Sequence, residues 1–266
     1  MIGAIIGDIA GSRFEFSNYR AKDFELFGDG CFATDDSIMT LAVAQAIMDT
    51  SPGEAYLDAL AQNAVREMQH VGRPYPACGY GGRFYDWMYS DAPKPYDSFG
   101  NGAAMRISPV IDIARTEAEA KALSRAVTAV THGHPEGIKG AEATVIAGFM
   151  AKSGASKDEI RRRINRDYYA LDFTIDSIRD SYEFNETCQE TVPQAIEAFL
   201  EADSFEDSVR TAVSVGGDSD TLAAICCGIA EHFFGVPQEL EQAALKYLDA
   251  RLLGIYNAWR EFLSQR

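Results

Sequence analysis

Two short acidic motifs give the clearest chemical signal in the sequence. Residues 34–37 read Thr-Asp-Asp-Ser, and residues 216–221 read Gly-Gly-Asp-Ser-Asp-Thr. Each motif places two carboxylates beside a hydroxyl group and directly precedes an apolar segment with helical periodicity. Carboxylates and other oxygen donors are the ligands that hard divalent cations prefer. The motifs therefore predict a metal site where two helices begin.

Helix capping is the competing interpretation. Thr34 can accept a hydrogen bond from a backbone amide, and acidic residues in a first turn interact favourably with the helix dipole. A cap needs only one such side chain, whereas the second motif supplies both Asp218 and Asp220. These two converge only where a helix begins, because side chains two positions apart diverge on a regular helix. If the two helix starts meet, four carboxylates share one site and need cations to offset their repulsion.

The donor types narrow the choice of metal. Neither motif contains a histidine or a cysteine, which favours Mg²⁺, Mn²⁺ or Ca²⁺ over zinc. We predict two ions, which together can polarise one bound group. The five cysteines of the chain include no C-x-x-C pair, so we interpret them as reduced thiols of a cytoplasmic protein.

A third motif is the glycine-rich segment 98–102, which reads Ser-Phe-Gly-Asn-Gly. Glycines let backbone amides approach a diphosphate closely, and the start of a following helix attracts anions. An ordinary glycine-rich turn explains the same residues equally well. From the residues alone, both interpretations stay open.

The elements that must position these motifs are helical. Apolar residues recur every three or four positions in most of the chain, whereas only residues 169–175 alternate with a period of two, which we interpret as an extended connector. Residues 16–33 and 72–100 are predicted to be irregular. The fold class is therefore all-α, with residues 1–266 forming a single compact domain. The predicted helices cover residues 34–48, 57–68, 101–115, 117–131, 137–151, 158–165, 190–201, 205–214, 222–233 and 245–262.

Composition limits the partners. The chain has 266 residues with 24 Lys and Arg against 40 Asp and Glu, a formal net charge of −16. Such a surface repels nucleic acid and anionic lipid. No segment approaches the roughly 20 apolar residues of a membrane-spanning helix, and the first residues lack the basic region of a secretory signal.

Five motifs in order resemble the ADP-ribosylglycohydrolase family, which includes dinitrogenase reductase-activating glycohydrolase. The resemblance implies an all-α fold, a compact orthogonal helical bundle, with a binuclear Mg²⁺ or Mn²⁺ site. The motifs are Gly7-Asp8-Ile9-Ala10-Gly11-Ser12-Arg13-Phe14-Glu15, Thr34-Asp35-Asp36, Ser98-Phe99-Gly100-Asn101-Gly102-Ala103-Ala104-Met105-Arg106, Thr131-His132 and Gly217-Asp218-Ser219-Asp220-Thr221-Leu222-Ala223.

The same resemblance implies roles for individual residues. Glu15 matches the catalytic glutamate of the family, and His132 matches a histidine that contacts the ligand. The loop at 98–102 is implied to bind the diphosphate of ADP-ribose, with Phe99 stacking on adenine, while Met105 and Arg106 are expected to support this loop from behind. The implied metal ligands are Thr34, Asp35, Asp36, Asp218, Asp220 and Thr221, and the implied ADP-ribose contacts are Ser98, Phe99, Gly100, Asn101, Gly102 and His132.

The resemblance implies hydrolysis of the N- or O-glycosidic bond that joins ADP-ribose to an acceptor, most often a protein side chain such as arginine or serine. A modified nucleic acid is the least favoured acceptor. Two alternatives are a non-catalytic ADP-ribose-binding or crystallin-like protein of the same fold, and an all-α prenyl-diphosphate enzyme, whose D-D-x-x-D pattern the chain lacks. Residues that recognise the acceptor are expected in 16–33 and 72–97. Tyr75, Tyr80, Arg83 and Tyr85 are candidates, and surface packing explains these residues equally well.

Overall fold

The structure is a computed structural model that describes residues 1–266, and it confirms the all-α prediction. Its only β-type pairing is an isolated antiparallel bridge between Gly100 and Thr187. Residues 169–174 are an irregular connector, as predicted. The helices are α1 (Ile2–Ser12), α2 (Asp35–Met48), α3 (Tyr56–Gly72), α4 (Gly82–Tyr89), α5 (Gly102–Met105), α6 (Ser108–Ile113), α7 (Glu117–Thr128), α8 (Pro135–Lys152), α9 (Lys157–Asp167), α10 (Ile175–Ile178), α11 (Cys188–Glu201), α12 (Phe205–Val213), α13 (Ser219–Phe234), α14 (Gln238–Ala244), the 3₁₀ turn η1 (Leu245–Tyr247) and α15 (Ala250–Ser264).

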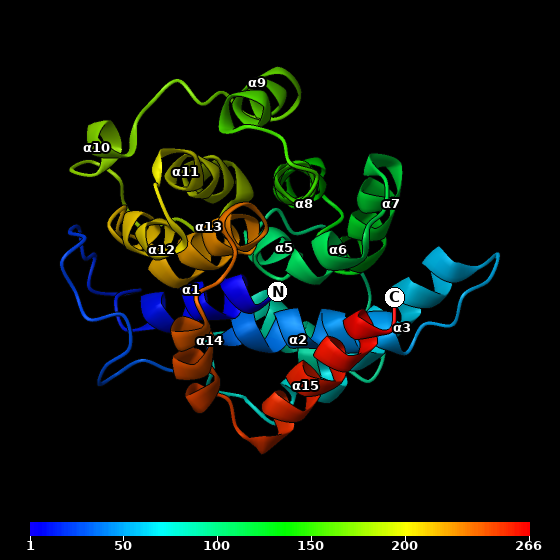
Figure 1. The fold of residues 1–266 in the computed structure, drawn as a ribbon. Coiled ribbons are helices and arrows are strands. Elements are labelled where there is room, and N and C mark those ends of the chain that lie inside the picture. The colour runs from blue at the N-terminus through cyan, green and yellow to red at the C-terminus, as the bar shows by residue number, and fades with distance from the viewer.

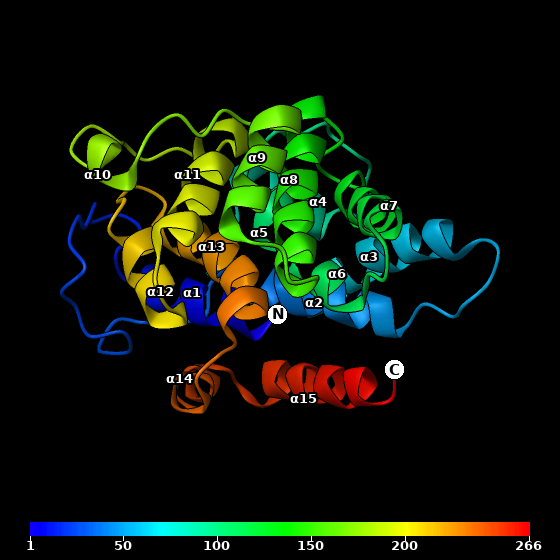
Figure 2. The same cartoon turned by 45° about the horizontal axis from the view of Figure 1, so that its top comes forward.

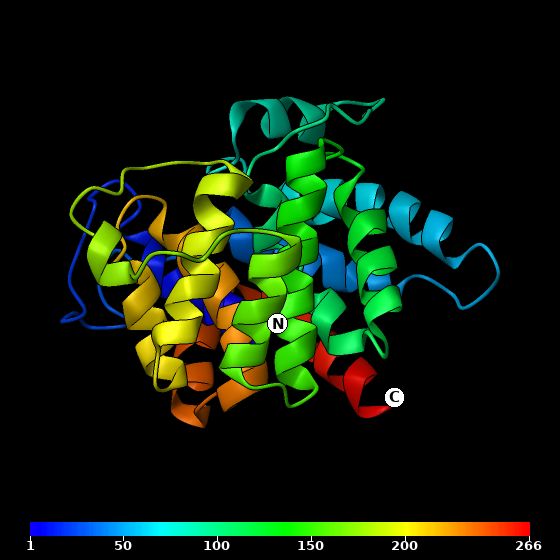
Figure 3. The same ribbon diagram turned by 90° about the horizontal axis from the view of Figure 1, so that it is seen from above.

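Helices α1 and α13 form the centre of the bundle. Almost every residue of α1 is buried, so this helix is apolar on all sides rather than amphipathic. It packs against α13, while α2 lies beside it and α15 crosses below α2 (Figure 1). Helices α8 and α11 run nearly perpendicular to α2 (Figures 1 and 3), which gives the orthogonal arrangement that the family resemblance implies. One continuous apolar core extends from Met1 to Trp259.

Three glycines on one face of α1 set the distance between α1 and α13. Gly3, Gly7 and Gly11 are four residues apart, so they share a face of the helix. A Cβ atom added at Gly7 would lie 2.2 Å from the carbonyl oxygen of Ala223 in α13. The two backbones can therefore approach this closely only because these three positions lack side chains.

Several helices differ from the predicted ones, and α1, α10 and α14 are not among the helices predicted from the sequence. The helix predicted at 101–115 is two helices, α5 and α6, because Pro109 in the first turn of α6 cannot continue the preceding turn. The helix predicted at 245–262 is interrupted before Asp249, whose side chain caps α15 by accepting hydrogen bonds from two backbone amides. The stretch 72–100 contains helix α4, whereas 16–33 is irregular as predicted.

The C-terminal helices and the loops around α4 lie on different sides of the bundle. Helices α14 and α15 form a layer on the side of α2 that faces away from α8 (Figure 2). Helix α4 and its flanking loops project from the opposite side of the bundle (Figure 3). None of the helices is both long and apolar enough to span a bilayer.

The contact between α1 and α13 predicts a large effect of a very small substitution. Gly7→Ala should lower the free energy of unfolding by about 1–3 kcal/mol or more, because the new methyl group meets backbone atoms that cannot move alone. Denaturant titration measures the change. Gly254→Ala in exposed helix α15 is the matched control, since nothing lies within 4 Å of its added Cβ. The control should stabilise the protein by up to about 1 kcal/mol, and equal effects of the two substitutions would contradict the packing argument.

Candidate metal centre and ligand cavity

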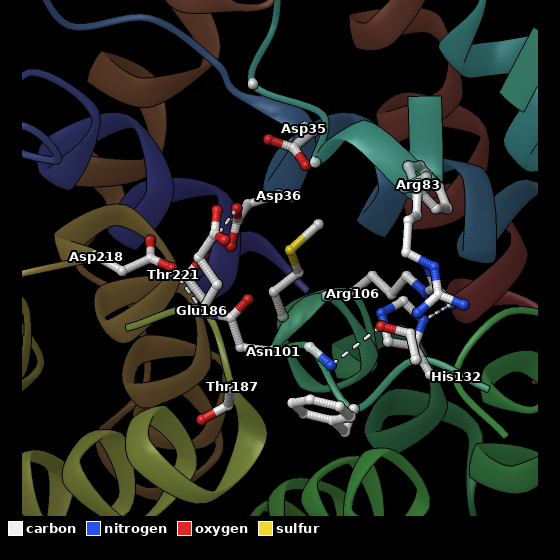
Figure 4. Close-up of a pocket in the computed structure, with 18 of the residues that line it drawn as sticks. Asp35, Asp36, Arg83, Asn101, Arg106, His132, Glu186, Thr187, Asp218 and Thr221 are labelled. Carbon is white, nitrogen blue, oxygen red and sulfur yellow. Dashed lines mark hydrogen bonds between the residues drawn. The ribbon is translucent and has the colours of Figure 1, made fainter. Parts of the chain in front are cut away.

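A cavity of about 330 Å³ lies where the starts of α2 and α13 meet the loop before α5. Twelve of the thirteen residues predicted from the sequence line this cavity, and Thr34 alone does not. Figure 4 shows the carboxylates on one side of the cavity and Arg83, Arg106 and His132 on the other. The twelve lining residues are Glu15, Asp35, Asp36, Ser98, Phe99, Gly100, Asn101, Gly102, His132, Asp218, Asp220 and Thr221.

The first acidic motif begins helix α2. The Thr34 hydroxyl accepts a hydrogen bond from the Asp36 amide at 3.2 Å, so Thr34 is the N-cap of this helix. The same hydroxyl donates to Asp8 at 2.7 Å, behind the cavity wall. The capping interpretation of Thr34 is thus confirmed. Its role as a metal ligand stays a prediction.

Asp8 is a functional candidate that the sequence argument did not single out. It is fully buried in α1, and its carboxylate accepts hydrogen bonds from the amide and hydroxyl groups of both Thr34 and Ser37. These four bonds hold the first turn of α2 against α1. The sequence signal for Asp8 is a single acid in the middle of a helix that is otherwise apolar on all sides. Such an acid is rarely buried without a partner, so it points to a specific contact.

The second acidic motif turns sharply before α13. Gly216 and Gly217 have φ values of +83° and +66°, a conformation that favours glycine. The turn buries Asp218 and directs it to Asn101, whose amide group donates to the carboxylate at 2.6 Å. Asp220 and Thr221 follow in the first turn of α13, and the Thr221 hydroxyl donates to Asp36 at 3.1 Å. The two helix starts therefore meet, as the motifs predicted.

The carboxylates form two groups that share one member. Oxygen atoms of Asp8, Asp36 and Asp220 lie within 4.8 Å of one another, and so do those of Glu15, Asp218 and Asp220. Burial and mutual repulsion raise the pKa of Asp36 and of Asp220 well above the ordinary value. No Lys or Arg forms an ion pair or a hydrogen bond with any of these acids, whose hydrogen-bond donors are hydroxyl and amide groups.

This donor set fits divalent cations. One oxygen of Asp36, Oδ1, is buried without any hydrogen-bond partner, as a carboxylate oxygen reserved for a cation would be. All donors are oxygen atoms, which suits Mg²⁺ or Mn²⁺ better than zinc. Two carboxylate groups that share Asp220 match two neighbouring cation positions.

Asp35 faces the cavity from a different direction, next to the loop before α4. The φ angle of Gly79 is +119°, and a Cβ atom added there would lie 2.6 Å from Asp35 Oδ1. The Asp35 amide also donates to the carbonyl oxygen of Cys78 at 3.0 Å. The loop before α4 therefore fixes the direction of Asp35. The sequence analysis did not connect this loop with the acidic motif.

Glu15 lies at the side of the cavity formed by the loop after α1, and it is partly exposed. Burial, together with repulsion from Asp218, Asp8 and Glu186, raises the pKa of Glu15 to about 7. This carboxyl group can therefore gain or lose a proton near neutral pH. Its position beside Asp218 and Asp220 is the one that the resemblance implied.

The loop 98–102 is bound to the segment before α11. The Asn101 amide donates to the carbonyl oxygen of Glu186 at 2.7 Å, and the Gly100 amide donates to Ser98 Oγ at 3.1 Å. The Ser98 amide is also paired within the protein, so the amides of Phe99 and Gly102 are the ones left for a ligand. Because α5 has a single turn, its dipole attracts an anion less strongly than the dipole of the long helix predicted at 101–115 would.

Arg106 makes one end of the cavity cationic, and His132 lies beside it. Arg106 is 1% exposed, and burial lowers its pKa to about 10, so it stays charged. It donates to the Thr131 hydroxyl at 2.6 Å, which leaves that hydroxyl free to donate to His132 Nδ1 at 2.7 Å. Burial and the nearby arginines hold the pKa of His132 well below its usual value, so the ring is neutral and carries its proton on Nε2, facing Gly100 and Gly102.

Two expectations about neighbouring residues need correction. Met105 and Arg106 line the cavity rather than only supporting the loop from behind. Among the candidates for acceptor recognition, Arg83 lines the cavity, whereas Tyr75 donates to Asp249 and Tyr80 to the carbonyl oxygen of Gly72. Tyr85 packs against Tyr89 outside the cavity. These three tyrosines therefore follow the packing alternative, which uses the same residue types as binding, whereas Phe84 and Tyr96 of the same stretch line the cavity.

Substitution of Asp8 should lower the affinity for metal, although Asp8 does not line the cavity. Asp8→Ala should weaken Mn²⁺ binding about 10- to 100-fold, because the first turn of α2 loses the acceptor of four hydrogen bonds. Isothermal titration calorimetry on the folded variant measures this. Ser37→Ala removes only one donor hydroxyl and should have a smaller effect. Equal Mn²⁺ affinity of Asp8→Ala and the unmodified protein would show that Asp8 does not position the ligands.

The raised pKa values predict a pH dependence. When the pKa of a carboxyl group is higher in the folded than in the unfolded protein, the folded state binds more protons, and stability falls as pH rises. For the metal-free protein this fall should extend from about pH 4 to about pH 7, the pKa of Glu15. Since cations bind the deprotonated groups, the increase in melting temperature caused by Mg²⁺ should be larger at pH 8 than at pH 5, by about severalfold. Scanning calorimetry measures this increase in melting temperature. An increase that does not depend on pH would contradict the prediction.

Comparison with known proteins identifies relatives of this chain. The sequence model of the ADP-ribosylglycohydrolase family matches residues 1–258. The protein "ADP-ribosylhydrolase ARH3" of Danio rerio is 22% identical over 308 residues, which cover 89% of this chain and 82% of that protein. An uncharacterized protein of Archaeoglobus fulgidus is 28% identical over 158 residues, 52% of this chain and 50% of that protein.

A solved structure described as an ADP-ribosylglycohydrolase-related protein complex has the same fold, with a TM-score of 0.65 and 20% identity. The similarity covers 97% of this chain and 95% of that chain. The family match confirms the resemblance and includes all five motifs that the sequence analysis identified. This protein therefore belongs to the ADP-ribosylglycohydrolase family.

Proposed function

We propose that this protein is a metal-dependent hydrolase that cleaves the N- or O-glycosidic bond between ADP-ribose and a modified protein side chain, such as arginine or serine. Membership of the family supports ADP-ribose glycohydrolase activity in general terms. The observation that carries the proposal is the polarity of the cavity, which has carboxylates without ion-pair partners at one end and Arg106 at the other. This polarity suits a substrate with a ribose at one end and an anionic diphosphate further along.

In this proposal the carboxylate end holds two divalent cations, Mg²⁺ or Mn²⁺. When bound, they supply positive charge that orients the ribose hydroxyls and stabilises the transition state. The chain's own residues provide the rigid frame, since buried hydrogen bonds fix Thr34 and Asp218. The proposed ligands are Thr34, Asp35, Asp36, Asp218, Asp220 and Thr221, with Asp8 holding the first motif.

Glu15 is the proposed acid–base group. Without bound cations its pKa is raised to about 7, so this carboxyl group can exchange a proton near neutral pH. Cleavage at the anomeric carbon proceeds through an oxocarbenium-like transition state. Glu15 transfers the proton that moves between the attacking water and the leaving acceptor. With cations held by Asp218 and Asp220, the pKa of Glu15 would be lower and its carboxylate form would be favoured.

The rest of ADP-ribose is proposed to lie along the loop 98–102. The free amides of Phe99 and Gly102 and the Nε2–H group of His132 donate to the diphosphate. Arg106 adds a positive charge at the same end. Phe99 is 43% exposed within the cavity lining, so its ring is accessible for stacking on adenine.

The alternatives fit the site less well. A non-catalytic ADP-ribose-binding or crystallin-like protein has no need for a cluster of unpaired buried acids, which destabilises the fold. A prenyl-diphosphate enzyme is disfavoured by the family match and by the absence of the D-D-x-x-D pattern. We also propose that residues 1–266 act as one domain, since one apolar core connects their helices. A cytoplasmic location stays a prediction.

Substitutions of one proposed metal ligand and of the proposed acid–base group test the proposal. Asp220→Asn should abolish Mg²⁺-dependent release of ADP-ribose from ADP-ribosylarginine, because both carboxylate groups lose their shared member. Glu15→Gln should retain ADP-ribose binding but reduce kcat by about 100-fold or more. Product release measured by chromatography, with calorimetry for binding, separates the two effects.

Two controls make the experiment decisive. Asp203→Asn changes an exposed acid outside the cavity and should leave turnover unchanged. Unmodified protein treated with EDTA should lose activity and regain it with Mg²⁺ or Mn²⁺. Full turnover without divalent cations would falsify the metal-dependent mechanism, and wild-type kcat in Glu15→Gln would exclude Glu15 from proton transfer.

A further inference from the structure

Two exposed phenylalanines stack on each other beside the cavity. Phe16 is 85% exposed, the most exposed large apolar side chain of the protein, and Phe184 is 42% exposed. Their ring centroids are 5.8 Å apart, with an angle of 28° between the ring planes. Phe16 follows Glu15, and Phe184 lies two residues before Glu186, which also lines the cavity. An exposed aromatic pair next to a binding cavity is typical of a contact surface for a partner.

Hydrogen bonds hold this aromatic pair, Phe16 and Phe184, in place. The Arg20 guanidinium donates to the carbonyl oxygens of Arg179 and Tyr182, so the loop after α1 is joined to the segment after α10. These two segments lie side by side in Figures 1 and 2, the first in dark blue and the second in yellow-green. The pair is therefore part of a defined wall of the site.

The same wall packs on the turn that presents Asp218. Asn18 Oδ1 accepts a hydrogen bond from the Gly217 amide at 2.9 Å. A Cβ atom added at Gly217 would lie 3.3 Å from the Cα atom of Phe184. The aromatic pair therefore lies on the carboxylate side of the cavity rather than on the cationic side at Arg106.

The charge around the pair is negative. Glu15, Glu183 and Glu186 are all at least partly exposed on these two segments. The nearby cations are already engaged, because Arg20 binds two carbonyl oxygens and Arg179 pairs with Asp176. A partner that contacts the pair thus meets an apolar surface with exposed carboxylates beside it.

We propose that the aromatic pair is the docking surface for the polypeptide segment around the modified residue, and that this segment is basic and carries an apolar side chain next to the modified one. This inference rests on the proposed function, since the acceptor leaves the ribose on the side of Glu15. The apolar neighbour packs on Phe16 and Phe184, while basic residues face Glu183 and Glu186. A nucleic acid would bring phosphates against these carboxylates, and a second copy of the chain would add another net charge of −16.

The test compares a peptide with a free amino acid as acceptor. The substrates are ADP-ribosylarginine and a peptide with the same modified arginine, flanked by lysines and one leucine. Phe16→Ser and Phe184→Ser should each lower the ratio of kcat/KM for the peptide to kcat/KM for the amino acid by about tenfold, because an apolar contact is lost. Leu57→Ser is the matched control, since Leu57 is 43% exposed at the start of α3, outside the cavity. An unchanged ratio in both phenylalanine variants would overturn the inference.

A binding measurement separates this inference from the proposed function. Fluorescence anisotropy with the unmodified lysine-flanked peptide should show weaker binding to Phe16→Ser than to the unmodified protein, whether or not hydrolysis occurs. Failure to cleave both ADP-ribosylarginine and ADP-ribosylserine would contradict the proposed function, whereas equal peptide binding would contradict only the docking surface. Tighter binding of a glutamate-flanked peptide or of a single-stranded oligonucleotide would also overturn the choice of a basic polypeptide.

Discussion

The direct backbone contact between α1 and α13 is the constraint on which the whole site depends. It brings Asp8, in the middle of α1, next to Asp220 in the first turn of α13. The contact requires glycine at positions 3, 7 and 11, because any Cβ atom there would overlap backbone or side-chain atoms of α13. Asp8 in turn fixes the start of α2 through Thr34 and Ser37. One close helix pair thus determines where three chain segments place their oxygen atoms.

Convergence of the carboxylates has an electrostatic cost that the protein alone does not remove. Asp36 and Asp220 are buried and lie near further acids, yet their hydrogen-bond donors are hydroxyl and amide groups. A buried acid without a positive partner is stable when it is protonated or binds a cation. Metal binding, pH and folding stability are therefore linked through the same side chains. Apolar packing around α1 must supply the free energy that holds this arrangement before any cation binds.

The sequence predicted the residues around the site better than the segments between them. The acidic motifs were recognisable because helix capping cannot explain both Asp218 and Asp220. Glu15 and His132 were found only through the family resemblance, since an isolated glutamate or histidine has no local pattern. Asp8 and Gly79 depend on contacts between distant segments, which periodicity does not reveal. The long loops were the least predictable part, because α4 and the aromatic pair have no alternating or helical repeat long enough to recognise.

The net charge of −16 has a different meaning once the charges are located. Arg106 and the neutral Nε2–H group of His132 give the proposed diphosphate end of the cavity a favourable potential inside an acidic protein. The opposite end of the cavity is lined by carboxylates, and further carboxylates continue outward from Glu186 to Glu183. An ADP-ribosylated protein carries an anionic ADP-ribose group on a polypeptide whose neighbouring side chains can be basic. The two ends of this site therefore match the two halves of such a substrate, whereas a polyanion would match only one of them.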